Sequence, residues 1–203
     1  MMIRTDRVNI KVGFPFFATA SLFLCTGMGY NYLLCMLFSL MHESGHIIAM
    51  KTMGCNIKEI SLSGMGIKIE KSNSMLSYAQ ECIVALCGPA VNLIMTLILL
   101  FYKTENNFSE ISFNINLGLL LINLLPVVML DGGRFIKYLL LNFLSESDVE
   151  RILCFIEFVV LIVLICILSA ALFYNLATDY FVFFVLCLVG MTVFDMLNHR
   201  LIV

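Results

Sequence analysis

Six long apolar segments dominate this sequence. They span residues 14–30, 32–53, 80–102, 112–131, 152–174 and 180–198. A helix needs about 20 apolar residues to cross the roughly 30 Å hydrocarbon core of a bilayer, and each segment is close to that length. Of the 203 residues, 61% are hydrophobic and only 13% are charged, which excludes an ordinary soluble domain. The sequence therefore predicts an all-α polytopic membrane protein with about six transmembrane helices.

The basic residues indicate how these spans are oriented. Six spans put both termini on one side, and 11 of the 12 Lys and Arg fall on that side, with Lys103 alone opposite. Short cytoplasmic loops collect Lys and Arg, so we expect both termini in the cytoplasm of a multi-pass protein of a bacterial plasma membrane. The basic residues occur singly rather than in a stripe, so we expect no binding to nucleic acid.

A different pattern occupies residues 57–70, where apolar side chains alternate with small or charged ones. This alternation favours a small β-hairpin on the cytoplasmic side of the membrane. Its edge would offer main-chain hydrogen bonds to an extended peptide substrate, and the candidate residues for this strand are Ile60, Leu62, Gly64, Met65, Gly66 and Ile67. The alternative is a loop that lies on the bilayer surface.

The remaining connections indicate a single unit. Residues 134–151 begin with an apolar stripe and predict a short interfacial helix. Neither an internal repeat nor a low-complexity segment interrupts the chain. We therefore expect one membrane-embedded domain over residues 1–203, with a core in residues 33–134 and two additional spans in residues 152–198.

The strongest chemical signal is an HExxH motif inside the second apolar segment. It runs from His42 through Glu43 to His46. Residues four apart lie one turn apart on the same face of a helix, so both imidazoles can bind one metal ion. Glu43 lies about 100° round the helix from His42, where it can take a proton from water at the metal. The alternative is two histidines that are merely packed in the interior.

A catalytic zinc site needs a third protein ligand, and a carboxylate is the remaining choice. Asp131 ends the fourth apolar segment, in a stretch where Pro126 breaks the helix and two glycines permit an irregular backbone. Asp131 is therefore the expected third ligand, although the same residues also suit a plain helix-ending turn. His199 is interpreted as a solvated end cap, and Glu157 and Asp195 as residues near the cytoplasmic interface.

A third motif interrupts the third apolar segment. Gly88 and Pro89 are followed by a polar amide at Asn92. The functional interpretation places a hydrogen-bond donor near the reaction centre, where it would stabilise an oxyanion. The alternative is a kink in which Asn92 bonds a freed carbonyl group.

Together the three motifs resemble those of the site-2 protease family of intramembrane zinc metalloproteases. Residues 42–54 resemble the extended HExGH block of the family, residues 88–92 its GPxxN motif, and residues 123–133 its NxxPxxxLDGG motif. The resemblance implies one Zn²⁺ held by His42, His46 and Asp131, Glu43 as the general base, and a hairpin that helps to present substrate. The six-span plan without an inserted PDZ domain looks most similar to the sporulation-type branch, here lacking its CBS domain.

The leading hypothesis is an intramembrane zinc metalloendopeptidase that hydrolyses a peptide bond within or next to a membrane segment of another protein. Its partners would be a membrane-protein or membrane-tethered substrate and a membrane regulatory protein. Two alternatives remain open, a catalytically silent scaffold that binds membrane helices and a metal transporter. A glutamate directly after the first histidine favours the protease, because neither alternative requires it.

Overall fold

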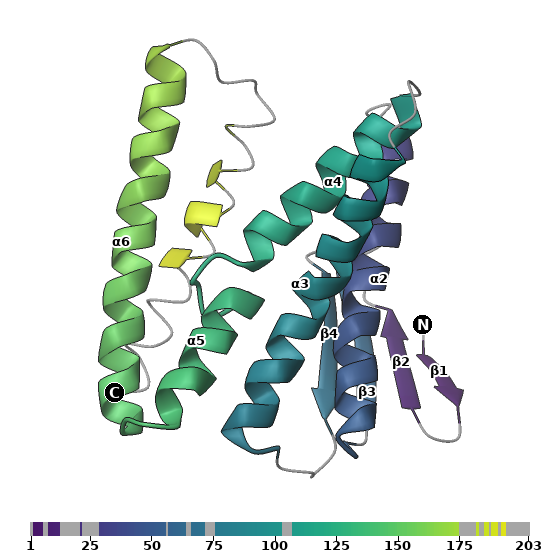
Figure 1. Cartoon of the computed structure of the whole chain (residues 1–203), viewed down its shortest axis with the longest axis vertical. Coiled ribbons are helices and arrows are strands. Elements are labelled where there is room, and N and C mark those ends of the chain that lie inside the picture. The colour runs from purple at the N-terminus through teal and green to yellow at the C-terminus, as the bar shows by residue number, and fades with distance from the viewer. Residues whose placement is uncertain are drawn as a thin grey trace. The chain divides into compact units, whose positions relative to one another are not determined.

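The structure is a computed structural model that describes residues 2–5, 8–12, 21, 29–55, 57–63, 66–71, 76–102, 107–174, 182, 185–186, 188–190 and 192–193. Most of the described residues are helical (Figure 1). The chain divides into two compact units, Met1–Asn123 and Leu124–Val203, and each is described by itself. The expected single domain stays a prediction.

The first unit contains three long helices, α2 (Gly29–Thr52), α3 (Tyr78–Phe101) and α4 (Asn107–Asn123). Ser77 begins α3 with a capping box, because its side chain accepts from the Gln80 N–H while the Gln80 side chain accepts from the Ser77 N–H. Helices α2 and α3 approach closely at Gly45. A Cβ atom there would collide with the carbonyl oxygen of Cys87 and lie 2.9 Å from Cγ2 of Val91.

Helix α2 ends in a Schellman motif. Gly54 has a φ of 77°, in the left-handed region that glycine adopts without strain. The Gly54 N–H bonds the Lys51 carbonyl at 3.0 Å and the Cys55 N–H bonds the Met50 carbonyl at 2.9 Å. This turn directs the chain straight into the first strand after α2.

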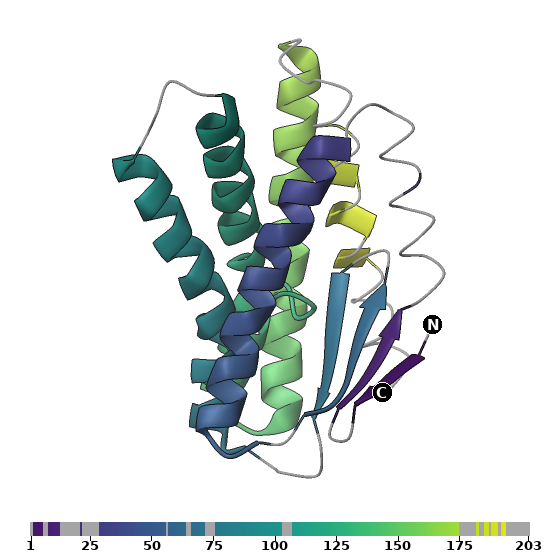
Figure 2. The same ribbon diagram turned by 90° about the vertical axis from the view of Figure 1, so that its right-hand side faces the viewer.

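Four strands form one sheet in the first unit (Figure 2): β1 (Met2–Thr5), β2 (Val8–Val12), β3 (Ile57–Ser63) and β4 (Gly66–Lys71). Their order is β1-β2-β3-β4. β1 and β2 are antiparallel, β2 and β3 are parallel, and β3 and β4 are antiparallel with Leu62 opposite Ile67. Lys11 Nζ lies 2.7 Å from Glu59 Oε1 and ties β2 to β3.

The sheet is larger than the sequence predicts. Over residues 57–70 the structure has two antiparallel strands, but β1 and β2 were not expected in the charged N-terminal segment. Both are short, and β2 pairs in parallel with a strand far along the chain. Pairing of that kind depends on tertiary contacts that local alternation of residues does not reveal.

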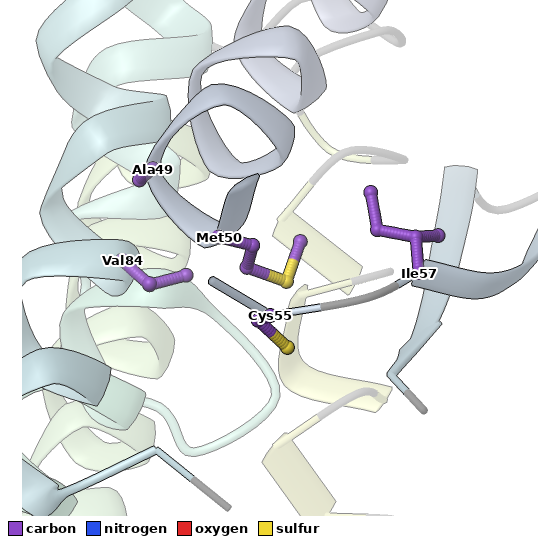
Figure 3. Packing of buried hydrophobic residues seen from close by; sticks show 5 residues of the cluster. All are labelled: Ala49, Met50, Cys55, Ile57 and Val84. Atoms are coloured by element: carbon purple, nitrogen blue, oxygen red, sulfur yellow. The ribbon is translucent and has the colours of Figure 1, made fainter. Parts of the chain in front are cut away.

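A small hydrophobic core joins the end of α2 to the sheet and to α3 (Figure 3). Its buried members are Ala49, Met50, Cys55, Ile57 and Val84. Met50 and Cys55 are also the two residues that the Schellman motif brings together, so capping and packing reinforce each other. This core fixes the C-terminal half of α2, which carries the HExxH motif, against α3.

The second unit contains α5 (Asp131–Leu141) and α6 (Glu146–Phe173). Residues 124–130 before α5 are not helical. The expected apolar span over 112–131 is not one helix: α4 is 17 residues long and ends at Asn123, and Asp131 begins a new helix, in agreement with the helix break predicted at Pro126. Pro126 explains the interruption, since it lacks an N–H and disfavours a helical residue before it. The short helix predicted after residue 134 is confirmed as α5, which begins three residues earlier.

Helices α2, α3 and α6 are long and apolar enough to cross a membrane. They confirm the predicted segments 32–53, 80–102 and 152–174 as helices of spanning length and composition. Most of the predicted first and last spans, 14–30 and 180–198, lies outside the described residues. The total of six spans stays a prediction.

Candidate metal centre

The two histidines of the HExxH motif face each other across one turn of α2. Nε2 of His42 lies 3.2 Å from Nε2 of His46, and the side chains are only 5% and 4% exposed. Two imidazole nitrogens bound to the same tetrahedral zinc at 2.0–2.1 Å would be about 3.3 Å apart. The pair therefore has the spacing that one zinc ion needs.

A hydrogen bond to α3 orients His46. Its Nδ1 lies 2.7 Å from the carbonyl oxygen of Val84, which is buried. A carbonyl oxygen only accepts, so Nδ1 carries the proton and Nε2 of the neutral ring is left as the ligand atom. The main chain of α3 thus selects the tautomer that metal binding requires.

Gly88 on α3 faces both ligand nitrogens. A Cβ atom at this position would lie 2.7 Å from Nε2 of His42 and would collide with Nε2 of His46. Glycine is the residue that keeps this volume free of side-chain atoms. The space that a Cβ would fill lies beside two convergent imidazole nitrogens. This arrangement fits a small cation.

Asn92 follows Gly88 by one helical turn on α3. Its side chain is 0% exposed, and neither atom of its amide has a hydrogen-bond partner among the described residues. The expected break at Gly88 and Pro89 does not occur, because α3 runs continuously through Pro89. Within the described part of the chain, Asn92 also does not bond a freed carbonyl group, as the alternative interpretation required. An unpaired buried amide is costly, which favours a functional role.

Glu43 lies beside His42 on α2 and is partly buried. Because consecutive helical residues are about 100° apart, its carboxylate projects from a different face than the two imidazoles. This is the position expected for a proton acceptor that is not itself a ligand.

In the second unit, Asp131 is the first residue of α5 and is 6% exposed. Its carboxylate lies in the first turn, where the helix dipole favours a negative charge. Oδ1 is 3.6 Å from the Arg134 guanidinium, which is an ion pair longer than a hydrogen bond. Asp131 is therefore a buried carboxylate whose backbone position is set by the start of α5.

Gly132 and Gly133 allow the preceding segment to fold back against the start of α5. A Cβ at Gly132 would lie 2.7 Å from the Leu125 carbonyl oxygen, and one at Gly133 would lie 2.5 Å from the Val128 nitrogen and closer still to Val127. These contacts require bare backbone at both positions. The Asp-Gly-Gly sequence is thus more than a helix-ending turn.

The structure gives less support to the candidate residues of the substrate strand. β3, with Ile60 and Leu62, has β2 on one side and β4 on the other, so its main chain is not an open edge. In the described sheet the open edge beside β3 belongs to β4, with Gly66 and Ile67. Four further residues lie outside the described part of the chain: Gly64, Met65, Asp195 and His199.

The sequence did not identify Glu157 as a site residue, but the structure buries it and gives it a specific hydrogen bond. Glu157 was expected near the cytoplasmic interface in a helix-pairing or snorkelling role and was left out of the site, and its side chain is 0% exposed. Its Oε1 accepts a hydrogen bond of 2.9 Å from the Val128 N–H. The signal for this role was present in the sequence, because an ionisable residue inside an apolar helix marks a functional candidate.

Comparisons with known proteins agree with this geometry. The model of peptidase family M50 matches residues 102–164. A candidate zinc metalloprotease of Synechocystis sp. is 28% identical over 165 residues, which cover 64% of this chain and 43% of the relative. The site-2 protease from Methanocaldococcus jannaschii has a similar fold, with a TM-score of 0.65 and 18% identity over 98% of this chain and 94% of that one. These matches agree with the resemblance of the three motifs to the site-2 protease family.

Proposed function

We propose that this chain is an intramembrane zinc metalloprotease, which hydrolyses a peptide bond within or next to a membrane segment of another protein. The observation that carries the proposal is the 3.2 Å separation of two buried imidazole nitrogens on a helix of membrane-spanning length. Ionisable groups inside such a helix are costly and are kept for function. A zinc metalloprotease among the relatives points to the same chemistry.

The proposed metal ligands are His42, His46 and Asp131. Each of the three side chains offers one atom of a kind that binds zinc. Two neutral imidazoles and a carboxylate suit zinc and leave a fourth position for water. Zinc bound there would supply a Lewis acid and lower the pKa of water toward about 7.

Glu43 and Asn92 are the proposed groups that act on the substrate. Glu43 accepts a proton from the attacking water and later donates it to the leaving amine, which conserves protons over the reaction. The Asn92 amide N–H would donate to the oxygen of the scissile carbonyl as negative charge develops on it. Its buried and unpaired amide supports this role. Asn92 and Pro89 are on the same helix as Gly88, which lies against the histidine pair, and Asn92 follows Gly88 by one turn.

The substrate would be an extended segment of a membrane or membrane-tethered protein. A helical peptide has its amides bonded internally, so the segment must unwind before its bond can be hydrolysed. The open edge of β4, including Gly66 and Ile67, offers main-chain hydrogen bonds to such a segment. Ile60 and Leu62 would support this edge from the neighbouring strand.

We further propose the six-span topology with both termini in the cytoplasm of a bacterial plasma membrane. The distribution of basic residues supports it, with 11 on the terminal side and Lys103 opposite. A regulatory membrane protein remains part of the proposal, and nucleic acid does not.

Co-expression with single-span membrane proteins tests the activity. Wild-type protein should release a cleaved substrate, and Glu43→Gln should lower the rate by about 10²–10⁴-fold while retaining zinc. Glu150→Gln is the matched control, because Glu150 is exposed on α6. Normal cleavage by Glu43→Gln would overturn the mechanism. A wild-type protein that binds helices without cleaving them would indicate a scaffold, and zinc passing into vesicles would indicate a transporter.

A further inference from the structure

Glu157 lies where an apolar side chain would be expected. The other buried residues of α6 are Val149, Leu153 and Leu164, and Glu157 follows Leu153 by one turn. Its carboxyl group is completely buried on a helix apolar enough to span a membrane. Burying such a group is unfavourable unless something compensates for the loss of water. A specific partner is therefore required.

One such partner is a main-chain N–H of the irregular segment before α5. Glu157 Oε1 accepts from the Val128 N–H at 2.9 Å. Residues 124–130 are not helical, so they lack the regular ladder of main-chain bonds. Short-range bonds support the segment within itself, from the Val127 N–H to the Leu125 carbonyl and from the Leu130 N–H to the Val127 carbonyl, each 2.8 Å long. The Glu157 bond ties the middle of this segment to α6.

The tied residue lies close to the proposed ligand. Val128 precedes Asp131 by three residues, and bare backbone at Gly133 contacts Val127 and Val128. Val127 itself is 1% exposed. A shift of Val128 would therefore be passed to the first turn of α5, where the Asp131 carboxylate is held.

We propose that Glu157 is a positioning residue, which fixes residues 124–130 through the Val128 N–H and thereby sets the orientation of Asp131. This inference rests on the proposed function, because it takes Asp131 as a metal ligand. The hydrogen bond needs an acceptor at Oε1 and not a negative charge. A glutamine at this position keeps the acceptor, whereas a leucine of similar size removes it.

The experiment compares Glu157→Gln and Glu157→Leu with wild type in two measurements. The first is hydrogen exchange of residues 127–130 in the metal-free protein, and the second is zinc affinity by competition with a chelator. Glu157→Leu should speed exchange at Val128 and weaken zinc binding by about 10–100-fold. Glu157→Gln should stay close to wild type in both. Leu153→Ala is the control for lost packing on the same face of α6, and it should lower stability while leaving Val128 protected.

The outcomes separate this proposal from the proposed function. Wild-type exchange and zinc affinity in Glu157→Leu would overturn the positioning role. Equal losses in a folded Glu157→Gln would also overturn it, because the charge and not the acceptor would then matter. If wild type binds no zinc, the proposed function fails, whereas unchanged zinc affinity in Asp131→Ala would remove Asp131 from the ligand set. Exchange at Val128 would still decide whether Glu157 holds the segment.

Discussion

Gly88 of α3 and His42 of α2 are so close that a Cβ atom on residue 88 would lie 2.7 Å from Nε2 of His42. The same atom would collide with Nε2 of His46. The volume beside the two ligand nitrogens therefore depends on the absence of one methyl group. This makes Gly88 a sensitive test of the metal site.

Gly88→Ala should weaken zinc binding by about 10–100-fold, because the added methyl group displaces one or both imidazoles. Gly118→Ala is the matched control, since a Cβ at Gly118 on α4 meets nothing within 4 Å. That variant should bind zinc normally and gain up to about 1 kcal/mol in free energy of unfolding. Zinc titration and thermal unfolding measure both effects. Normal zinc affinity in Gly88→Ala would contradict the proposed location of the ion.

His46→Ala and Asp131→Ala should each lower zinc content from about one ion per chain, because a site with two protein ligands is weak. Zinc is measured by elemental analysis of purified protein. Glu150→Gln should retain full occupancy as an exposed carboxylate control. If Asp131→Ala keeps its zinc, Asp131 is removed from the ligand set and another third ligand must be sought.

Proline substitutions in β4 test whether substrate adds to the sheet. Neighbouring residues of a strand direct their N–H groups to opposite edges, so Ile67, Lys68 and Ile69 alternate between β3 and the open edge. Prolines on the open edge should lower cleavage with zinc content unchanged, because each removes one main-chain donor. Prolines on the paired edge should disturb the sheet itself. Alanine at the same positions is the control, and full activity of all three zinc-loaded proline variants would argue against strand addition.

Cysteines introduced at Asn107 and at Ser147 should react with membrane-impermeant reagents from opposite sides. Asn107 begins α4 and follows Lys103 by four residues in the sequence, while Ser147 follows the connection between α5 and α6. Both are exposed. The background for this labelling is a variant in which the chain's own eight cysteines are replaced. Reaction from the same side would refute the proposed topology.

Several features follow from local sequence alone. Residues four apart on a helix share a face whatever surrounds them, so the HExxH spacing predicts the pairing of His42 and His46. Long apolar runs likewise predict α2, α3 and α6, because only internally bonded backbone is stable in a bilayer. Pro126 predicts that the helix before Asp131 is interrupted, since proline cannot donate the required hydrogen bond. Each of these rules acts within a few turns of the chain.

Other features depend on contacts between segments far apart in sequence. The parallel pairing of β2 with β3, which makes β4 and not β3 the open edge, requires backbone partners that no local alternation specifies. The contact of Gly88 with both histidines depends on how closely α2 and α3 pack. Glu157 looked like an interfacial charge because sequence shows its distance from a helix end and not its burial. Only the fold of the second unit brings the Val128 N–H to its carboxylate.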